Sequence, residues 1–251
     1  MEHLSLAGWL VVVIAVLITG ISKSAFGGAL GGIGVPLMTL FMPPGLAVAV
    51  MLPILCFMDM FGVRAYWKKW SAHDLRIIIP GGLVGIVLGT LAMGALPETL
   101  IKGCIGGIAV LFMLDRIFSL REKLRMAGEP GPVAGGMWGA LSGFTSTLAH
   151  AGGPPVLVYL LGRKLAKENF VATSAVYFTV INAAKILPYI WLGLFTRETL
   201  TLALCLAPLA PVGVWLGLRV MRKLPERPFF ITATAMLGIT GLKLLWDALA
   251  G

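Results

Sequence analysis

Residues 20–36, with the sequence GISKSAFGGALGGIGVP, interrupt a long apolar segment with glycines, two serines and a lysine. A second apolar segment is interrupted in a similar way at 145–155, by TSTLAHAGGPP. Glycine and proline both disfavour the interior of a helix. The segments 6–41 and 133–162 are therefore each predicted to be broken near the middle, and these breaks decide how the rest of the chain is threaded.

The chain as a whole is far more apolar than a soluble protein. Of its 251 residues, 58% are hydrophobic and 12% are charged, and the mean hydropathy is +0.94. Soluble domains carry about 25% charged residues. We therefore predict an integral membrane protein whose outer faces contact the lipid bilayer.

Several apolar runs are long enough to cross a membrane, which takes about 20 helical residues. These runs lie at 46–66, 75–95, 98–119, 169–192, 199–219 and 228–249. Together with the two broken segments, they predict an all-α polytopic membrane protein.

Basic residues indicate which loops face the cytoplasm. Most of the 20 lysines and arginines fall in four loops, at 64–76, 116–125, 163–167 and 219–227. By the positive-inside rule, these loops are predicted to be cytoplasmic. Each broken segment must then return to the side from which it starts, as a hairpin of two short helices. Both chain termini are predicted to be periplasmic.

The two halves of the chain share a pattern that indicates duplication. LPE occurs at 96–98 and again at 224–226, and Gly31-Gly32 correspond to Gly152-Gly153. Further pairs with matching order are Asp59 with Asn182, Pro80 with Pro208, Gly85 with Gly213, and Gly89 with Gly217.

Each half therefore contains a broken hairpin followed by three crossing helices, and an odd number of net crossings makes the halves inverted copies. We predict a first membrane repeat at 1–119, a cytoplasmic linker at 120–132 and a second, inverted repeat at 133–251. In transporters, inverted repeats with glycine- and proline-broken helices place the binding site at the breaks.

Charged and polar residues lie inside the predicted membrane segments. Lys23 falls in the first break and His150 in the second, whereas Asp59, Asn182 and Lys185 lie in crossing helices. An ionised group at a helix centre costs at least ~2.5 kcal/mol, so such residues are usually functional. Two lysines against one aspartate favour a small anion as ligand. Snorkelling of Lys23 and a purely structural pair of Asp59 with a lysine are the alternatives.

Several function classes fit the sequence poorly. The net charge of +9 is spread over loops between spans, so no nucleic acid is expected as a partner. The chain holds three histidines and no HExxH or GxxxxGK[ST] motif, so we expect neither an enzyme nor a metal or cofactor site.

The interrupted segments resemble the TauE/SafE sulfite and sulfonate exporter family. The similarity rests on GISKSAFGGALGGIGVPLM, on PPGLAVAVMLPIL followed by Asp59, on AHAGGPPVLVYLL and on the pair Asn182 and Lys185. It implies a secondary transporter that exports sulfite, thiosulfate or organosulfonates across a bacterial inner membrane. Many relatives have glycines where this chain has Ser24 and Ala25, which leaves the particular anion open.

The resemblance and the chemistry of the breaks together predict an anion site near the midplane, served by alternating access. Asp59 is expected to balance a lysine or to carry a coupling proton, with His150 as the other candidate for the proton, and a coupling cation in place of the proton stays open. The alternatives are an anion channel or a partner-dependent permease subunit, and the oligomeric state stays open. The predicted substrate-binding residues are Ser22, Lys23, Ser24, Gly27, Gly28, Gly31, Gly32, Thr145, Ser146, Thr147, His150, Gly152, Gly153, Asn182 and Lys185.

Overall fold

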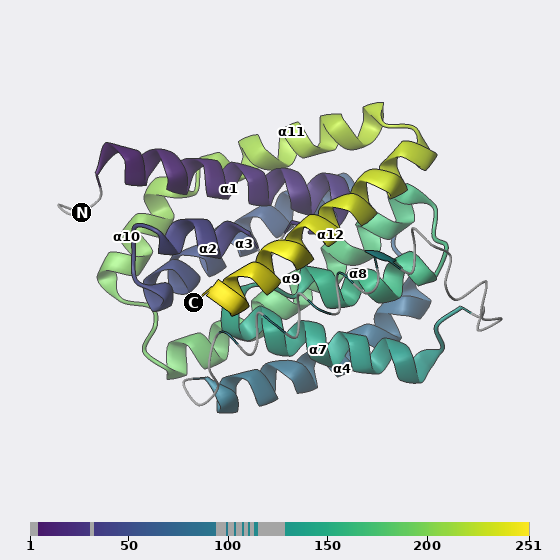
Figure 1. The fold of residues 1–251 in the computed structure, drawn as a ribbon, viewed down its shortest axis with the longest axis horizontal. Coiled ribbons are helices and arrows are strands. Elements are labelled where there is room, and N and C mark those ends of the chain that lie inside the picture. The colour runs from purple at the N-terminus through teal and green to yellow at the C-terminus, as the bar shows by residue number, and fades with distance from the viewer. Residues whose placement is uncertain are drawn as a thin grey trace.

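The computed structural model of the chain describes residues 5–30, 33–93 and 129–250, with a few single positions between 99 and 114. The regular elements in this part of the chain are all α-helices (Figure 1). They are α1 (Leu6–Phe26), α2 (Gly34–Thr39), α3 (Pro44–Ala65), α4 (Ala72–Ala92), α7 (Pro132–Ala149), α8 (Gly153–Gly162), α9 (Lys167–Trp191), α10 (Arg197–Leu206), α11 (Leu209–Lys223) and α12 (Glu226–Ala250).

Five of these helices, α1, α3, α4, α9 and α12, are long and apolar enough to cross a membrane. The prediction of an all-α polytopic membrane protein is confirmed. Most of the predicted span 98–119, most of the linker 120–132, and Gly31 and Gly32 lie outside the described residues. The predicted repeat boundaries at 119 and 133 stay a prediction.

The prediction of one continuous helix over the span 199–219 is wrong. The span consists of two helices, α10 and α11, which meet at a bend of 44°. The break falls at Ala207 and Pro208. Proline has no backbone N–H and its ring clashes with the preceding helical turn, so the helix ends there and restarts in a new direction.

Both predicted hairpins are present, but their arms are unequal, which corrects the expectation of two short helices. The first arms, α1 and α7, have 21 and 18 residues, and the second arms, α2 and α8, have 6 and 10. Helix α1 continues through Lys23 and ends only at Gly27, where φ is +62°. Lys23 therefore lies in the last turn of α1, and not in the break itself. A positive φ is the conformation in which glycine commonly ends a helix.

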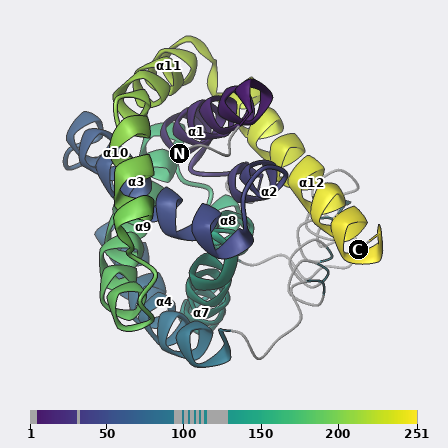
Figure 2. The same ribbon diagram turned by 90° about the vertical axis from the view of Figure 1, so that its left-hand side faces the viewer.

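Two helix pairs form opposite edges of the molecule. Figures 1 and 2 show α1 beside α11 at one edge and α4 beside α7 at the other, with α2, α3, α8 and α9 between these pairs. Each edge thus pairs the long arm of one hairpin with a crossing helix from the other half of the chain.

The two edges are built from equivalent positions of the predicted repeats. A methyl group added at Gly85 would collide with the carbonyl oxygen of Ala140, and one at Gly213 would lie 3.2 Å from that of Leu17. Leu17 and Ala140 are 123 positions apart, the same offset as the predicted pair Asp59 and Asn182 and two more than that of Gly31-Gly32 with Gly152-Gly153. Glycines permit such close helix contacts in membranes. These matched contacts support the duplication, and its inverted orientation in the bilayer stays a prediction.

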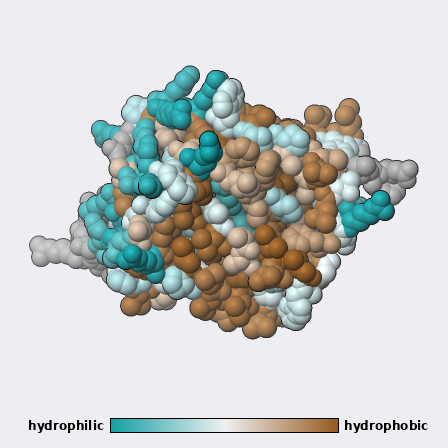
Figure 3. All heavy atoms as spheres, turned by 180° about the vertical axis from the view of Figure 1, so that it is seen from behind, coloured by the Kyte–Doolittle hydropathy of each residue, from teal (hydrophilic) through white to brown (hydrophobic). Residues whose placement is uncertain are grey.

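Three of the four basic loops lie at the same end of the bundle. Lys69 pairs with Glu168 at 2.7 Å, and the Nζ of Lys167 donates to the carbonyl oxygen of Leu224 at 2.6 Å. These contacts join the α3–α4 loop, the start of α9 and the end of α11. Figure 3 shows hydrophobic side chains across the middle of one face, with hydrophilic ones gathered toward the left-hand end. This distribution matches a bundle with one basic aqueous end.

Candidate functional site

The two hairpins and the helices α3 and α9 line a small, partly open cavity with a volume of about 30 Å³. Six of the predicted site residues line it, and they come from both halves of the chain. They are Lys23, Gly28, Ser146, His150, Gly153 and Asn182.

Lys23 is held by an ion pair beside this cavity. Its Nζ lies 2.6 Å from Oδ1 of Asp59, whose side chain is 2% exposed. Asn182 donates from Nδ2 to the other carboxylate oxygen at 2.7 Å. No donor among the described residues makes a well-aligned hydrogen bond to Oδ1, so the charge of Lys23 is what stabilises that oxygen. Lys23 therefore points into the protein, which contradicts the snorkelling alternative.

Asp59 and Asn182 are also equivalent positions of the two predicted repeats. Their direct hydrogen bond is the contact expected where a pseudo-two-fold axis passes between α3 and α9. The sequence did not decide which lysine Asp59 contacts. The structure selects Lys23 from α1 and leaves Lys185 to a different set of partners.

Lys185 is fully buried in α9, and among the described residues the groups within hydrogen-bond distance of its amine belong to Ser146 and His150. Its Nζ lies 2.9 Å from the hydroxyl and 3.1 Å from the carbonyl oxygen of Ser146, and 2.8 Å from Nδ1 of His150. Nε2 of His150 lies 2.9 Å from the carbonyl oxygen of Val48. A carbonyl can only accept, so we assign the imidazole hydrogen to Nε2 and the acceptor role to Nδ1.

The second break is held together by hydroxyl groups of α7. His150 ends this helix with φ of +52°, and its N–H donates to the carbonyl oxygen of Ser146. Ser142 donates to the carbonyl oxygen of Gly152 at 2.6 Å, and Thr145 donates to that of Ala151 at 3.1 Å. The backbone groups released at the break thus receive partners inside the protein, as a membrane interior requires.

Four of the predicted anion-binding hydroxyls hydrogen-bond the backbone, and their role in anion binding stays a prediction. Ser22 accepts from the N–H of Leu30, and Ser24 donates to the carbonyl oxygens of Gly20 and Val214. Thr145 and Thr147 donate to backbone carbonyls within or next to α7. Of the five predicted hydroxyls, only that of Ser146 belongs to a residue lining the cavity.

Gly27 and Gly152 lie next to the cavity lining and have structural contacts. The carbonyl oxygen of Gly27 accepts from Ser174 at 2.6 Å, and that of Gly152 accepts from Ser142. A side chain at either glycine would press on these neighbours. Both residues shape the breaks that border the site.

Six residues that complete the cavity wall were not predicted from the sequence. They are Thr19, Gly34, Val35, Met51, Leu55 and Phe178. The ring centroid of Phe178 lies 5.5 Å from Nζ of Lys23. Helical spacing could have found two of the six. Thr19 precedes Lys23 by four residues and Phe178 precedes Asn182 by four, so each shares a helix face with a predicted residue.

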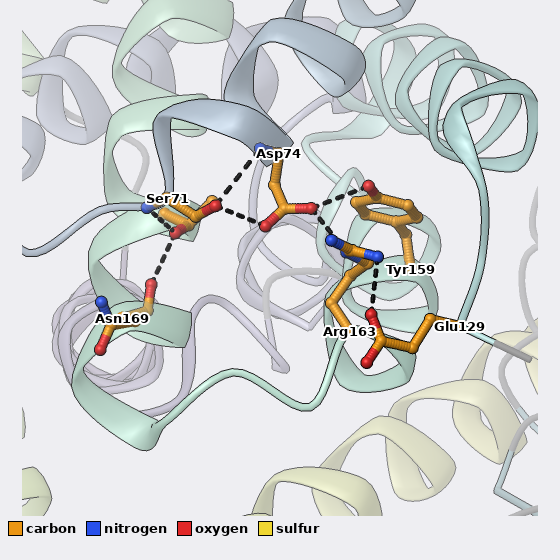
Figure 4. Close-up of polar contacts among 7 residues, drawn as sticks. Ser71, Asp74, Glu129, Tyr159, Arg163 and Asn169 are labelled. Atoms are coloured by element: carbon orange, nitrogen blue, oxygen red, sulfur yellow. Dashed lines mark hydrogen bonds and ion pairs between the residues drawn. The ribbon is translucent and has the colours of Figure 1, made fainter.

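A second buried polar cluster lies at the basic end of the bundle (Figure 4). Asp74 at the start of α4 accepts from Ser71 at 2.6 Å, from Tyr159 at 2.9 Å and from Nε of Arg163 at 2.7 Å, and Arg163 also pairs with Glu129. Partial burial favours neutral Arg163, but the hydrogen bond and charge of Asp74 outweigh it and raise the pKa of Arg163. None of these residues lines the cavity, so the cluster fastens α4 to α8.

The cavity combines cationic and hydrogen-bonding groups with an apolar wall. Among the described residues, no three His, Cys, Asp or Glu side chains gather as a metal site would require. Lys23, Ser146 and Asn182 can donate hydrogen bonds to a small anion. This arrangement of donors is suited to binding a small anion.

Residues 12–244 of this chain match the family model for "Sulfite exporter TauE/SafE". Comparison with curated proteins and with solved structures gives no match. The matched region contains both hairpins, the cavity and the pair of Lys23 with Asp59. Members of this family are membrane transporters and not enzymes. The chain therefore belongs to the sulfite exporter TauE/SafE family.

Proposed function

We propose that this protein is a secondary carrier that exports small sulfur-containing oxyanions across a bacterial inner membrane by alternating access. The observation that carries this proposal is the position of Lys23, which lines the cavity while it pairs with the buried Asp59. An anion that enters the cavity can replace the carboxylate of Asp59 as the partner of the Lys23 ammonium. Asp59 then keeps its hydrogen bond from Asn182.

The balance of charge around the cavity favours an anionic substrate. Among the described residues, Lys23 and Lys185 place two basic amines at or beside the cavity, and the carboxylate of Asp59 pairs with Lys23. Ser146 and Asn182 add neutral donors to the lining. A tetrahedral or pyramidal oxyanion offers several acceptor atoms to such a set of donors.

The size of the cavity favours the smallest members of the substrate class. About 30 Å³ holds about two water molecules. Sulfite has four heavy atoms and is larger than two water molecules, so the wall must already move to admit it. An organosulfonate requires a larger movement of the apolar side chains Val35, Met51, Leu55 and Phe178. We therefore place sulfite first, then thiosulfate, then short sulfonates.

The helix arrangement supports alternating access about this site. The site lies between the edge pairs α1–α11 and α4–α7, and each pair is tightly packed through glycines. Two rigid pairs that rock against each other would open the cavity to one side at a time. The membrane potential favours export of net negative charge by about 2.3 kcal/mol per charge per 100 mV.

The test is counterflow of labelled sulfite, thiosulfate and methanesulfonate in proteoliposomes that hold the purified protein. We expect exchange by the wild type and loss of exchange in Lys23→Gln. The matched control is Lys69→Gln, which removes an exposed lysine that is also ion-paired and should exchange normally. Conductance without exchange would indicate a channel. Equal exchange by Lys23→Gln and the control would show that the cavity is not the substrate site.

A further inference from the structure

Lys185 differs from Lys23 because the groups that it contacts fit either of its protonation states. An ammonium has three N–H hydrogens, and three acceptors surround this Nζ: the carbonyl and hydroxyl oxygens of Ser146 and Nδ1 of His150. A neutral amine has two N–H hydrogens and one lone pair. It can donate to the carbonyl oxygen and to Nδ1, and accept from the Ser146 hydroxyl.

The hydroxyl of Ser146 changes its role between these two states. Opposite the ammonium, it accepts from Lys185, and its own hydrogen is available to another partner. Opposite the amine, its hydrogen is used by the lone pair of Lys185. Ser146 also lines the cavity, so the partner in the first state is a group inside the cavity.

The other titratable groups nearby do not serve as well as proton sites. Nδ1 of His150 lies 2.8 Å from Nζ of Lys185, so these two nitrogens share one proton between them, and an imidazolium would need neutral Lys185 as its acceptor. An amine is several orders of magnitude more basic than an imidazole, so this proton stays on Lys185. Asp59 is held between the cation of Lys23 and the amide of Asn182, both of which favour the ionised carboxylate. Cys56 and Lys23 also lie close enough to Lys185 to act on its charge, but among the described residues neither is hydrogen-bonded to its amine.

We propose that Lys185 binds one proton together with each transported anion, and that the Ser146 hydroxyl links the two events. This inference rests on the proposed function. When the cavity is empty and Lys185 is neutral, the charges at the site are those of Lys23 and Asp59, which cancel each other. With a monovalent anion bound, protonated Lys185 balances the added negative charge. A proton on Lys185 also releases the Ser146 hydrogen, which then bonds to the anion.

The experiment is isothermal titration calorimetry of the protein in nanodiscs, with the anion that binds best among sulfite, thiosulfate and methanesulfonate. Repeating each titration in buffers of different ionisation heat, over about pH 6 to 9, counts the protons taken up. For sulfite, the count is corrected for the titration of the ion itself. We expect the wild type to take up close to one proton per anion at the alkaline end, and none where Lys185 is already protonated.

Three variants locate the proton. Lys185→Arg is always charged and should bind the anion without proton uptake. If the arginine does not fit, Lys185→Met should also bind without proton uptake, but more weakly. Ser146→Ala should bind at least about tenfold more weakly, because a hydrogen bond to a charged group is lost, whereas Ser146→Thr should bind normally. Asp59→Asn should still take up a proton if the variant binds the anion.

The outcomes separate the inference from the proposed function. Anion binding by the wild type without proton uptake at any pH in this range overturns the inference alone. So does proton uptake that persists in Lys185→Met, or uptake that is lost in Asp59→Asn while binding continues. If the wild type binds none of the three anions, the proposed function fails as well.

Discussion

The ion pair between Lys23 and Asp59 allows stability and transport to be separated by one set of variants. Lys23→Met removes the cation, Asp59→Asn removes the anion and keeps a partner for Asn182, and the double variant removes both charges. If the pair served only to hold α1 against α3, the double variant would be folded and active. We expect it to be folded and inactive.

The size of the effect follows from the geometry. Two unit charges 2.6 Å apart attract each other by about 6 kcal/mol at an effective dielectric constant of about 20. The loss of hydration offsets much of this attraction, because Asp59 is buried and the side chain of Lys23 is only 11% exposed. Removal of either partner alone leaves a buried unpaired charge, which we expect to lower the free energy of unfolding by about 3 to 5 kcal/mol. The double variant should recover about 2 to 4 kcal/mol of the summed loss.

The assay is reversible unfolding in mixed detergent micelles, followed by sulfite counterflow with the same preparations. The exposed pair Lys69 and Glu168 is the matched control, and its double-mutant cycle should give less than about 1 kcal/mol of coupling. Additive losses at Lys23 and Asp59 would contradict the buried-pair argument. Sulfite exchange by the double variant at the wild-type rate would contradict the role of Lys23 in binding.

Three further predictions follow from the packing. Gly85→Ala should lower the free energy of unfolding by about 1 to 3 kcal/mol, because the new methyl group collides with the backbone of α7. Gly136→Ala is the control and should leave the free energy of unfolding unchanged, because a methyl group at that position meets open space. Thermal unfolding in detergent compares the two variants. Asp74→Asn should cost about 2 to 4 kcal/mol in the same assay, since Arg163 loses its buried partner, while sulfite counterflow per folded molecule stays within about twofold of wild type. Phe178→Ala should enlarge the cavity and raise the rate of methanesulfonate exchange relative to sulfite, and an unchanged ratio would remove this side chain from the selectivity of the site.

The sequence predicted the crossing helices well where the signal was local. The run at 46–66 corresponds to α3 and the run at 75–95 to α4. About 20 apolar residues with few charges are enough for a helix to cross the hydrocarbon core of a bilayer, whatever the rest of the chain does. It failed at 199–219, where Pro208 divides the segment. A proline in an apolar run permits either a kinked helix or two helices, and packing against neighbours chooses between them.

The hairpins show a similar limit. Glycines and serines predicted a break somewhere within 20–36, and the helix in fact continues through Lys23 to Phe26. Helix propensity is a weak preference that tertiary contacts override. Here Ser24 donates to the carbonyl oxygen of Val214 on α11, a contact from the other half of the chain that no local pattern contains.

Composition and local pattern determined the class of this protein, its breaks and the small set of polar residues at membrane depth, because the cost of burying a polar group in lipid acts on each residue separately. Only the tertiary structure decided which of these residues meet. Thr145, Ser146 and Thr147 are neighbours in sequence, yet successive helical residues point about 100° apart, and the packing of α7 turns Ser146 alone toward the cavity. Likewise, Asp59 pairs with Lys23, and Lys185 contacts Ser146 and His150, because of how four helices pack together.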